Sequence, residues 1–526
     1  VNAMFVVAAD LHASGVDARV GQQYLDTATF LLGSQHSLDF VESTSWTIRA
    51  NDLLWNWNRS ASEPFALAPR GQTVPPPAPV TSPAPGSSVA AWRSVELAAS
   101  LTSAGACLSD QVGVRLVVVG THPTLTLEAI TMIRDFAFAP GQLVEVGRTL
   151  GVAYKCTVFP EMCRGAEGGD PVADLIGPMD SPPSYDGYTL ARISQTLRSI
   201  GPSLWSSASG GAATLQLLVC TSPFIVCALL QAVMDIPMLG YLGLPLLWKR
   251  PTDHFDNAES RKAFWAQVDR LRQRSDVILF TNNPLLAEQV SFQATGSALP
   301  VVRPHARFAL ATYAPMRPTE ALLISRTKFL WVTLRCAIRH FTPPKYPISF
   351  TVANSDSKLT FQEMASHRAA VLVPWEHALM AFYEFYSMSV PLLMPDEQWA
   401  YRLVFDADGN LGSTAPQYMD VHPACDMAVG CDGGRHPYPP LMFTSLERRR
   451  YWYQYSSFAQ FPHIHRFSSI AGMLVTLLSF DAAETSAAMR EFNDVTLVHS
   501  AAFWRRAAAT VVVGQPSCMR DRGQKK

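Results

Sequence analysis

Residues 369–395, which read AAVLVPWEHALMAFYEFYSMSVPLLMP, constrain the fold of this chain more than any other stretch. Two short apolar runs, 369–373 and 390–394, each adjoin proline residues. Short, wholly apolar runs are typical of strands that are buried on both faces of a parallel sheet. The residues between them, 375–388, contain no glycine or proline, which favours a helix. The stretch therefore predicts a strand, a helix and a second parallel strand.

Two acidic residues, Glu376 and Glu384, lie eight positions apart on this predicted helix. That spacing corresponds to about 12 Å along a helix axis and about 80° around it. We expect Glu376 at the helix N-terminus, just past the carboxyl end of a strand, and Glu384 two turns further in. Ligands of open α/β sheets bind outside the carboxyl ends of the strands, so both carboxylates are candidate binding groups. The alternatives are a favourable N-terminal charge for Glu376 and a solvated helix position for Glu384.

The alternation of apolar runs with helical patterns extends over two parts of the chain. Predicted strands of the first part are 114–119, 215–220, 238–242, 276–280 and 299–302, and those of the second are 321–325, 348–353, 369–373 and 390–394. Predicted helices include 125–138, 223–234, 260–274, 283–290, 482–492 and 500–509. Helices that separate strands imply parallel, doubly wound sheets. The predicted fold class is therefore α/β, with two Rossmann-like doubly wound parallel-sheet domains.

A chain of 526 residues is long enough for two or more domains. We place an N-terminal domain at 1–310, a C-terminal domain at 318–500, and a helix and tail at 501–526. A proline-rich insertion at 73–88 interrupts the first domain.

A strand at residues 4–9 would open the first domain and bring Asp10 and His12 to its carboxyl end. There they are candidate binding residues. A helix cap and a surface histidine explain the same two residues equally well.

The charge balance argues against a nucleic-acid partner, because 42 basic and 43 acidic residues give a net charge of −1. The apolar tract 215–248 carries Asp235 as its one charge, and its prolines and glycines favour a buried strand–helix–strand over a membrane span. Because the chain begins with Val1, an upstream signal or anchor stays open, and so does association with a membrane. Cytoplasmic and Golgi or ER locations both stay open.

Nine cysteines give two pairs of interest. Cys220 and Cys227 lie in apolar segments and are expected to be small core residues. Cys425 and Cys431 could form a metal site with nearby histidines, but their spacing does not match the common ligand pairs. We therefore favour loop residues or a disulfide for this second pair, and predict no metal site.

Several stretches resemble the GT-B glycosyltransferases, and most closely uncharacterised eukaryotic members. The matching stretches are LLVCTSPFIVCALLQAVMDIPMLGYLG at 217–243, VILFTNNPLLAEQ at 277–289, ALLISRT at 321–327, 359–395, 458–477 and 486–493. The resemblance implies two domains that face each other across a cleft. It implies retaining transfer of a sugar from a nucleotide sugar, without a required metal or another cofactor. It also implies that Glu384 binds the ribose and that Glu376 lies near the donor sugar in a catalytic role.

Cleavage of a nucleotide sugar builds negative charge on the leaving diphosphate, which needs cations or helix N-termini. Arg326 and Lys328 follow the predicted strand 321–325 and are candidates for this role, with a surface pair as the alternative. Two elements of the family pattern are missing. A Gly-Gly pair does not follow the helix, and Trp331 stands where the Arg-x4-Lys pattern needs lysine.

These gaps keep two alternatives open: a catalytically inactive GT-B scaffold that acts as a binding or assembly subunit, and a nucleotide-sugar epimerase. Whether an acceptor would be a glycan, a lipid or a protein stays open.

Overall fold

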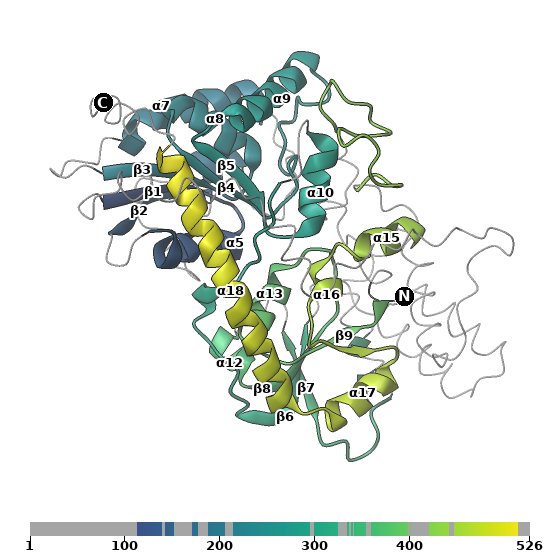
Figure 1. Cartoon of the computed structure of the whole chain (residues 1–526). Helices are drawn as coiled ribbons and strands as arrows, with labels where there is room; N and C mark the ends of the chain where they lie inside the picture. Colours follow the sequence, from purple (N-terminus) through teal and green to yellow (C-terminus); the bar gives the residue numbers. More distant parts are fainter. Residues whose placement is uncertain are drawn as a thin grey trace, which may run out of the picture.

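The computed structural model describes residues 113–138, 143–151, 171–176, 188–205, 214–294, 299–324, 334–335, 338–339, 341–353, 359–397, 400, 420–440 and 446–513. These residues form two five-stranded parallel sheets with helices packed on them (Figure 1). The predicted strand at 4–9, the insertion at 73–88, Asp10, His12, Arg326 and Lys328 lie outside the described residues.

The first sheet has the strand order β2-β1-β3-β4-β5, and every pairing is parallel. Its strands are β1 (Gly113–Val119), β2 (Val144–Leu150), β3 (Thr214–Cys220), β4 (Met238–Leu242) and β5 (Val277–Thr281). Its core strands read as continuous apolar runs because both faces are covered. One face packs against α7 (Leu190–Trp205), α8 (Phe224–Met234) and α9 (Ala258–Gln273), and the other against α5 (Pro123–Met132).

Two expectations for the first half need correction. The helix predicted at 125–138 is α5 followed by a π-helical turn, Ile133–Ala137. The strand predicted at 299–302 is a single bridge between Thr281 and Val301. Pro300 and Pro304 flank this bridge, and proline has no N–H to extend a ladder.

The second sheet has the order β10-β9-β8-β6-β7, again with every pairing parallel. Its strands are β6 (Arg317–Ile324), β7 (Ser349–Ala353), β8 (His367–Leu372), β9 (Leu392–Pro395) and β10 (His465–Phe467). When the strands of each half are renumbered from 1 to 5 in chain order, both sheets have the order 2-1-3-4-5. This order has a switch point between its first and third strands, where ligands of open α/β sheets bind. The fold is therefore α/β with two doubly wound halves, as predicted.

The helix after β8 is shorter than predicted. It is α13 (Met380–Ser387), and residues 375–379 form an irregular loop before it. His377 and Leu379 are buried in this loop, whereas Glu376 and Ala378 are partly buried. Such an alternation from 376 to 379 is the period of an extended chain and not of a helix. Glu376 consequently precedes the helix and does not begin it.

The remaining helices of the second half are α12 (Phe361–Ala365), α15 (Leu446–Tyr453), α16 (Ser457–Gln460), α17 (Ile470–Ser479) and α18 (Ala482–Val513). The capping box of Thr360 and Glu363 predicted at α12 is confirmed. The two helices predicted at 482–492 and 500–509 are one continuous helix, α18. The residues that join them contain no glycine or proline, so nothing in the chain breaks the helix.

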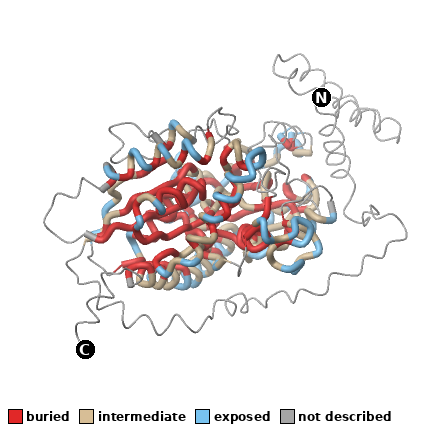
Figure 2. The backbone as a smooth tube through the Cα atoms, turned by 90° about the horizontal axis from the view of Figure 1, so that it is seen from above, coloured by how far each residue is buried: buried red, intermediate tan, exposed pale blue. Residues whose placement is uncertain are grey.

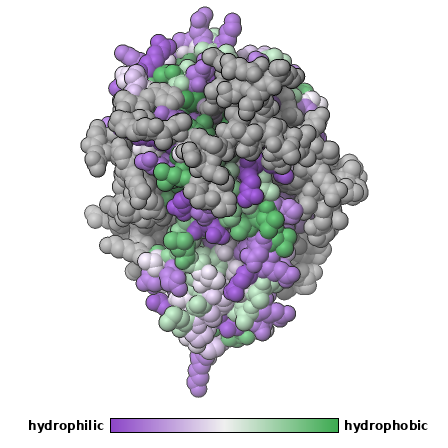
Figure 3. All heavy atoms as spheres, turned by 60° about the vertical axis from the view of Figure 1, so that its left-hand side comes forward, coloured by the Kyte–Doolittle hydropathy of each residue, from purple (hydrophilic) through white to green (hydrophobic). Residues whose placement is uncertain are grey.

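Helix α18 crosses from the second half to the first (Figure 1). Met489, near its start, packs in the core of the second sheet, and Trp504 and Val511 pack in the core of the first. Figure 2 shows buried residues running through the strands of both sheets. The exposed apolar side chains of α17 and α18 include Val475 and Val498, and apolar and polar side chains are intermixed on the coloured part of the face in Figure 3.

The apolar tract 215–248 folds as the buried unit β3–α8–β4, as predicted. Among the described residues, no single helix has the length and apolar character to cross a membrane. Helices α17 and α18 meet these criteria only as a pair, and the pair is bent by 90° at the break.

Two disulfides occur among the described cysteines. Cys425 is bonded to Cys431, which confirms one of the two expectations for that pair. Cys220 is bonded to Cys227, which corrects the prediction of two separate core cysteines. Both of these residues are nevertheless fully buried, between the end of β3 and the first turn of α8.

Candidate active site

The carboxyl edges of the two sheets face each other. Helix α5 begins directly after β1, and α13 follows β8 after its loop. Glu384 of α13 accepts a hydrogen bond from the hydroxyl of Thr124, in the first turn of α5. A polar contact between these two helices brings the carboxyl ends of β1 and β8 to the same place.

Two further contacts join α13 to the end of β5. The Tyr383 hydroxyl donates to the carbonyl oxygen of Asn282 at 3.3 Å and also contacts the Ser457 hydroxyl. The Asn282 amide donates to the sulfur of Met380 at 3.7 Å. Helix α13 thus spans the carboxyl edge of the first sheet, from β5 to β1.

Burial raises the pKa of Glu384 to about 7, and the hydrogen bond from Thr124 opposes this rise. The neutral carboxyl and the carboxylate are therefore both populated near neutral pH. Carboxyl groups with shifted pKa values are common at functional sites, and they also occur at buried structural positions. Glu384 lies where α13 meets the first half, and its ribose-binding role stays a proposal.

His122 is a site residue that the sequence reasoning missed. It caps α5, where its Nδ1 accepts from the backbone N–H of Leu125 at 3.4 Å and lies 3.2 Å from the Thr124 hydroxyl. Thr124 therefore connects the imidazole of the first half to the carboxylate of the second. The sequence does contain a signal for His122: the polar residues Thr121 and His122 directly follow the apolar run that ends at Gly120.

The switch point of the first half, between β1 and β3, is filled by hydroxyl groups. Thr121 Oγ1 lies 2.9 Å from Ser222 Oγ, and Thr126 Oγ1 lies 3.1 Å from Thr221 Oγ1. A Cβ at Gly120 would come within 2.0 Å of the Thr126 hydroxyl, so glycine is required here. These buried hydroxyls are hydrogen-bonded to one another, so the switch point of the first half is packed with side chains.

The switch point of the second half lies between β6 and β8. Ile324 pairs with Leu372, and the N–H of Val373 donates to the Ile324 carbonyl oxygen at 3.1 Å. The loop with Glu376 leaves β8 at this point, where β6 and β8 end side by side. The side chains of Arg326 and Lys328 belong to residues that the structure does not describe.

Helix α15 brings a cation towards this loop. The ring of Tyr453 contacts the buried ring of His377, with 6.4 Å between centroids. Arg449 lies four residues before Tyr453, on the same face of the helix. Burial, and to a smaller extent the charge of Arg449, lower the pKa of His377 to about 3. No sequence pattern pointed to Arg449, because α15 comes long after the second half's switch point in the chain.

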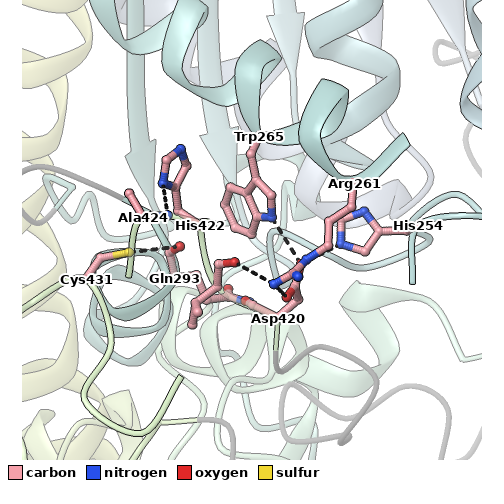
Figure 4. Close-up of polar contacts among 9 residues, drawn as sticks. His254, Arg261, Trp265, Gln293, Asp420, His422, Ala424 and Cys431 are labelled. Carbon is pink, nitrogen blue, oxygen red and sulfur yellow. Dashed lines mark hydrogen bonds and ion pairs between the residues drawn. The ribbon is translucent and has the colours of Figure 1, made fainter. Parts of the chain in front are cut away.

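A second polar cluster surrounds Asp420, beyond the junction (Figure 4). The buried Asp420 carboxylate accepts hydrogen bonds from His254 Nε2 at 2.8 Å, Arg261 Nε at 2.8 Å and Trp265 Nε1 at 3.1 Å. These donors hold the pKa of Asp420 at about 2, against the effect of its burial. Because His254 is fully buried, a substrate cannot reach this His–Asp pair, and the cluster is structural.

Asp420 begins a segment, residues 420–440, that we call the strap. It follows β9 in the second half and lies along α9 and α10 (Pro284–Gln293) of the first. His422 pairs with Asp269 at 2.9 Å, and His436 with Glu288 at 3.0 Å.

The part of the chain that the structure describes contains no group of three or more His, Cys, Asp or Glu side chains suited to a metal ion.

No protein-family model and no curated protein match this chain. Among solved structures it is similar to "Spinosyn Rhamnosyltransferase SpnG", with 12% identity over 74% of this chain and 99% of that chain, at a TM-score of 0.32. It is also similar to "the glycosyltransferase SnogD from Streptomyces nogalater", with 11% identity over 70% and 100% of the two chains, at 0.31. A third is "CalG4, the Calicheamicin Glycosyltransferase", with 14% identity over 71% and 100%, at 0.32.

These likenesses are distant, and the strand orders and the facing carboxyl edges carry the fold assignment by themselves. The printed names of the three solved structures are those of glycosyltransferases. The chain has the two-sheet α/β architecture that its resemblance to the GT-B glycosyltransferases implies.

Proposed function

We propose that this chain is a glycosyltransferase that moves a sugar from a nucleotide sugar to an acceptor. One observation carries the proposal: two sheets of the same strand order meet at their carboxyl edges, with Glu384 at the meeting point. Each such edge is a natural ligand site. Two facing edges suit a reaction in which two substrates must be held against each other.

The second half would hold the donor, because Glu384 belongs to it and the charge of Arg449 acts on His377 in the loop after β8. An ionised Glu384 would accept hydrogen bonds from the ribose hydroxyls. Arg326 and Lys328 would bind the diphosphate, and Arg449 is a further cation for it. The packed first half would hold the acceptor, with His122 as a polar group at its edge.

The reaction breaks the bond between the anomeric carbon and the diphosphate oxygen and forms a bond from that carbon to the acceptor oxygen. The acceptor proton leaves with the phosphate or a nearby base. We assign Glu376 the catalytic role of a carboxylate beside the donor sugar, where it would stabilise positive charge in an oxocarbenium-like transition state. The cations would stabilise the leaving diphosphate without a required metal. The resemblance favours a retaining outcome.

The direct test measures nucleotide release from a panel of nucleotide sugars. We expect the natural chain to release nucleotide, and Glu384→Gln to lose at least about tenfold of that activity, since an amide replaces one charged hydrogen-bond acceptor. Glu491→Gln is the matched control, because Glu491 is exposed on α18. Equal release by the natural chain and Glu384→Gln, or no release and no nucleotide binding, would rule the proposal out.

An inactive scaffold is the second candidate, and the missing diphosphate-binding pattern favours it. No Gly-Gly pair directly follows α13, and Trp331 stands where the Arg-x4-Lys pattern needs lysine. Calorimetry with uridine, guanosine and thymidine diphosphates separates the candidates. Micromolar binding supports the transferase, and no binding supports the scaffold. An epimerase would change the sugar of the donor without release of nucleotide.

A further inference from the structure

The disulfide Cys425–Cys431 closes a short loop of the strap against the end of α10. Its two cysteines are partly buried, whereas Cys220 and Cys227 are fully buried. Thiol–disulfide exchange requires that a thiolate reaches one of the two sulfurs. We propose that Cys425–Cys431 is a redox switch: its reduction loosens strap residues 425–436 from α10, and the loop before α13 then loses the support of α15. This inference does not depend on the proposed function.

The reduction step uses a dithiol as the electron donor. One thiolate of the dithiol attacks a sulfur of the disulfide, which breaks the S–S bond and forms a mixed disulfide, and the second thiolate then attacks that mixed disulfide. The products are the thiols of Cys425 and Cys431 and the dithiol oxidised to a cyclic disulfide. Two electrons and two protons pass from the dithiol to the cysteines, so no further reactant is needed.

The strap binds the C-terminal end of α10 on both sides of the disulfide loop. The N–H of Cys431 donates to the carbonyl oxygen of Phe292 at 2.7 Å, and the N–H of His422 donates to that of Gln293 at 2.8 Å. Figure 4 shows Cys431 beside Gln293. A Cβ added at Gly430 would come within 2.3 Å of the Phe292 ring. These contacts use the backbone of the strap, so they require its folded shape, and the disulfide limits the alternatives to that shape.

The closed loop also sets the position of His436. Gly433 and Gly434 lie between the disulfide and this histidine, and both have positive φ, 73° and 75°. Glycine has more accessible backbone conformations than any other residue. The N–H of Gly434 donates at 3.1 Å to the carbonyl oxygen of Val429, inside the closed loop. Opening of the disulfide therefore frees the segment that carries His436.

His436 is the polar bridge between α10 and α15. Its Nε2 lies 3.0 Å from the Glu288 carboxylate of α10, and its Nδ1 lies 2.8 Å from the Tyr451 hydroxyl of α15. A neutral imidazole serves both partners, because Nε2 donates to the carboxylate and Nδ1 accepts from the hydroxyl. The His436 ring also packs on Trp452, with 4.8 Å between centroids, and Trp452 packs on Leu285 of α10.

Helix α15 carries this contact to the loop before α13. Tyr453 contacts the ring of His377, which directly follows Glu376. Loss of the His436 bridge would loosen α15 and weaken the packing of this loop. The Asp420 anchor would stay in place, because its donors come from α9 and the residues before it. Reduction of one disulfide in the strap would thus reach a loop of the second half.

The test treats the natural chain with dithiothreitol at a concentration that leaves it folded. Alkylation of the freed thiols, measured by mass spectrometry, gives the rate at which each disulfide opens. We expect Cys425–Cys431 to open at least about tenfold faster than Cys220–Cys227. Amide hydrogen exchange should then become at least about tenfold faster in α15 and in residues 375–379. It should stay unchanged in α17, which packs in the core of the second sheet.

Two variants isolate the switch. The double variant Cys425→Ser, Cys431→Ser lacks the bond and nearly keeps the size of both side chains. We expect fast exchange of its α15 without reductant, and no further effect of dithiothreitol. His436→Phe keeps the disulfide and an aromatic ring but removes the polar bridge. Its α15 should also exchange fast, with no response to reductant.

Three outcomes would overturn the switch. They are equal opening rates of the two disulfides, opening of Cys425–Cys431 with unchanged exchange in α15, and a response of α15 to reductant in the double variant, which would act through other cysteines. Should the double variant fail to fold, the natural chain still decides, because exchange in α15 must rise with the same time course as reduction of Cys425–Cys431. No readout involves a nucleotide, so a failure of the proposed function is distinguishable from a failure of the switch.

Discussion

The two halves are joined by two kinds of contact, one at the junction with α13 and one on its flanks. At this junction, α13 meets the first half through hydrogen bonds from Thr124, Tyr383 and Asn282. On one flank, the strap places the buried Asp420 among several donors. On the other flank, α18 runs through both cores (Figure 1).

The α18 flank also holds the segment that connects the halves. Arg303, in this segment, is hydrogen-bonded to Asn493 and Thr496 of α18, and its guanidinium lies over the ring of Phe461 with 4.6 Å to the centroid. Burial lowers the pKa of Arg303 to about 10. The comparison shows that firmly held flanks coexist with a sparser junction at α13.

The largest expected effect belongs to the strap. Asp420→Ala leaves the buried donors of His254 and Trp265 without their acceptor, and we expect a loss of about 3–5 kcal/mol in the free energy of unfolding. Denaturant unfolding at pH 7 measures this loss. Asp426→Ala is the control, since Asp426 is exposed on the same strap, and it should change stability by less than about 1 kcal/mol.

The pH dependence of this contribution follows from the pKa of Asp420, which is lowered to about 2. The folded state therefore favours the carboxylate. Its stabilisation is present above the ordinary aspartate pKa and is lost as the pH falls through about 2. If Asp420→Ala proves no less stable than Asp426→Ala, the strap is not a firm flank and the comparison fails.

A smaller effect is expected at Glu128, on the α18 flank. This fully buried carboxyl of α5 accepts from the backbone N–H of His305 at 2.6 Å, and His305 in turn contacts Ser500 of α18 at 2.9 Å. Burial raises the pKa of Glu128 to about 7, and the charges of Arg303 and Arg307 oppose the rise.

A raised carboxyl pKa means that the folded state keeps its proton where the unfolded chain has lost it. Stability should therefore fall as the pH rises from about 4.5 to 7, and level off above that. Glu128→Gln keeps an oxygen acceptor for His305 and removes the titration. We expect it to raise the free energy of unfolding by about 2 kcal/mol at pH 8 and to leave it nearly unchanged at pH 4.5. Unfolding curves of both proteins between pH 4.5 and 8 measure the difference, and parallel pH profiles would contradict the assignment.

Much of the fold followed from local sequence signals. The apolar runs of β1, β3, β4 and β8 and the capping box at Thr360 are properties of neighbouring residues, and sequence alone predicted them. The loop before α13 was missed because it depends on which side chains meet a distant part of the chain, as His377 meets Tyr453. The continuity of α18 was a local signal, since the residues that join its two predicted pieces contain no glycine or proline.

Only the part of the candidate site that lies in the second half, between β8 and β9, was predictable from sequence. Glu384 stood out because it sits between two buried strands, and its raised pKa is a consequence of that burial. Its partner Thr124 and the neighbouring His122 come from another sheet, and nothing in either segment specifies the pairing. Arg449 reaches the β8 loop from α15, through the fold and not through sequence spacing.

The smallest expected effect is at the junction between α13 and the first half. Tyr383→Phe removes a buried hydroxyl that donates to the Asn282 carbonyl oxygen at 3.3 Å and contacts Ser457. The phenyl ring keeps its packing against Phe382, so the loss should be about 1 kcal/mol.

Tyr386→Phe is the control, because the Tyr386 hydroxyl donates at 3.0 Å to Pro462 within the second half. Both variants lose one buried tyrosine hydrogen bond, and only Tyr383→Phe weakens the contact between the halves. We expect the two variants to unfold at similar denaturant concentrations. If the contact of α13 with the first half yields when a ligand binds, Tyr383→Phe alone should change the affinity for a nucleoside diphosphate. Equal affinities in calorimetric titrations would mean that the junction does not part when a ligand binds.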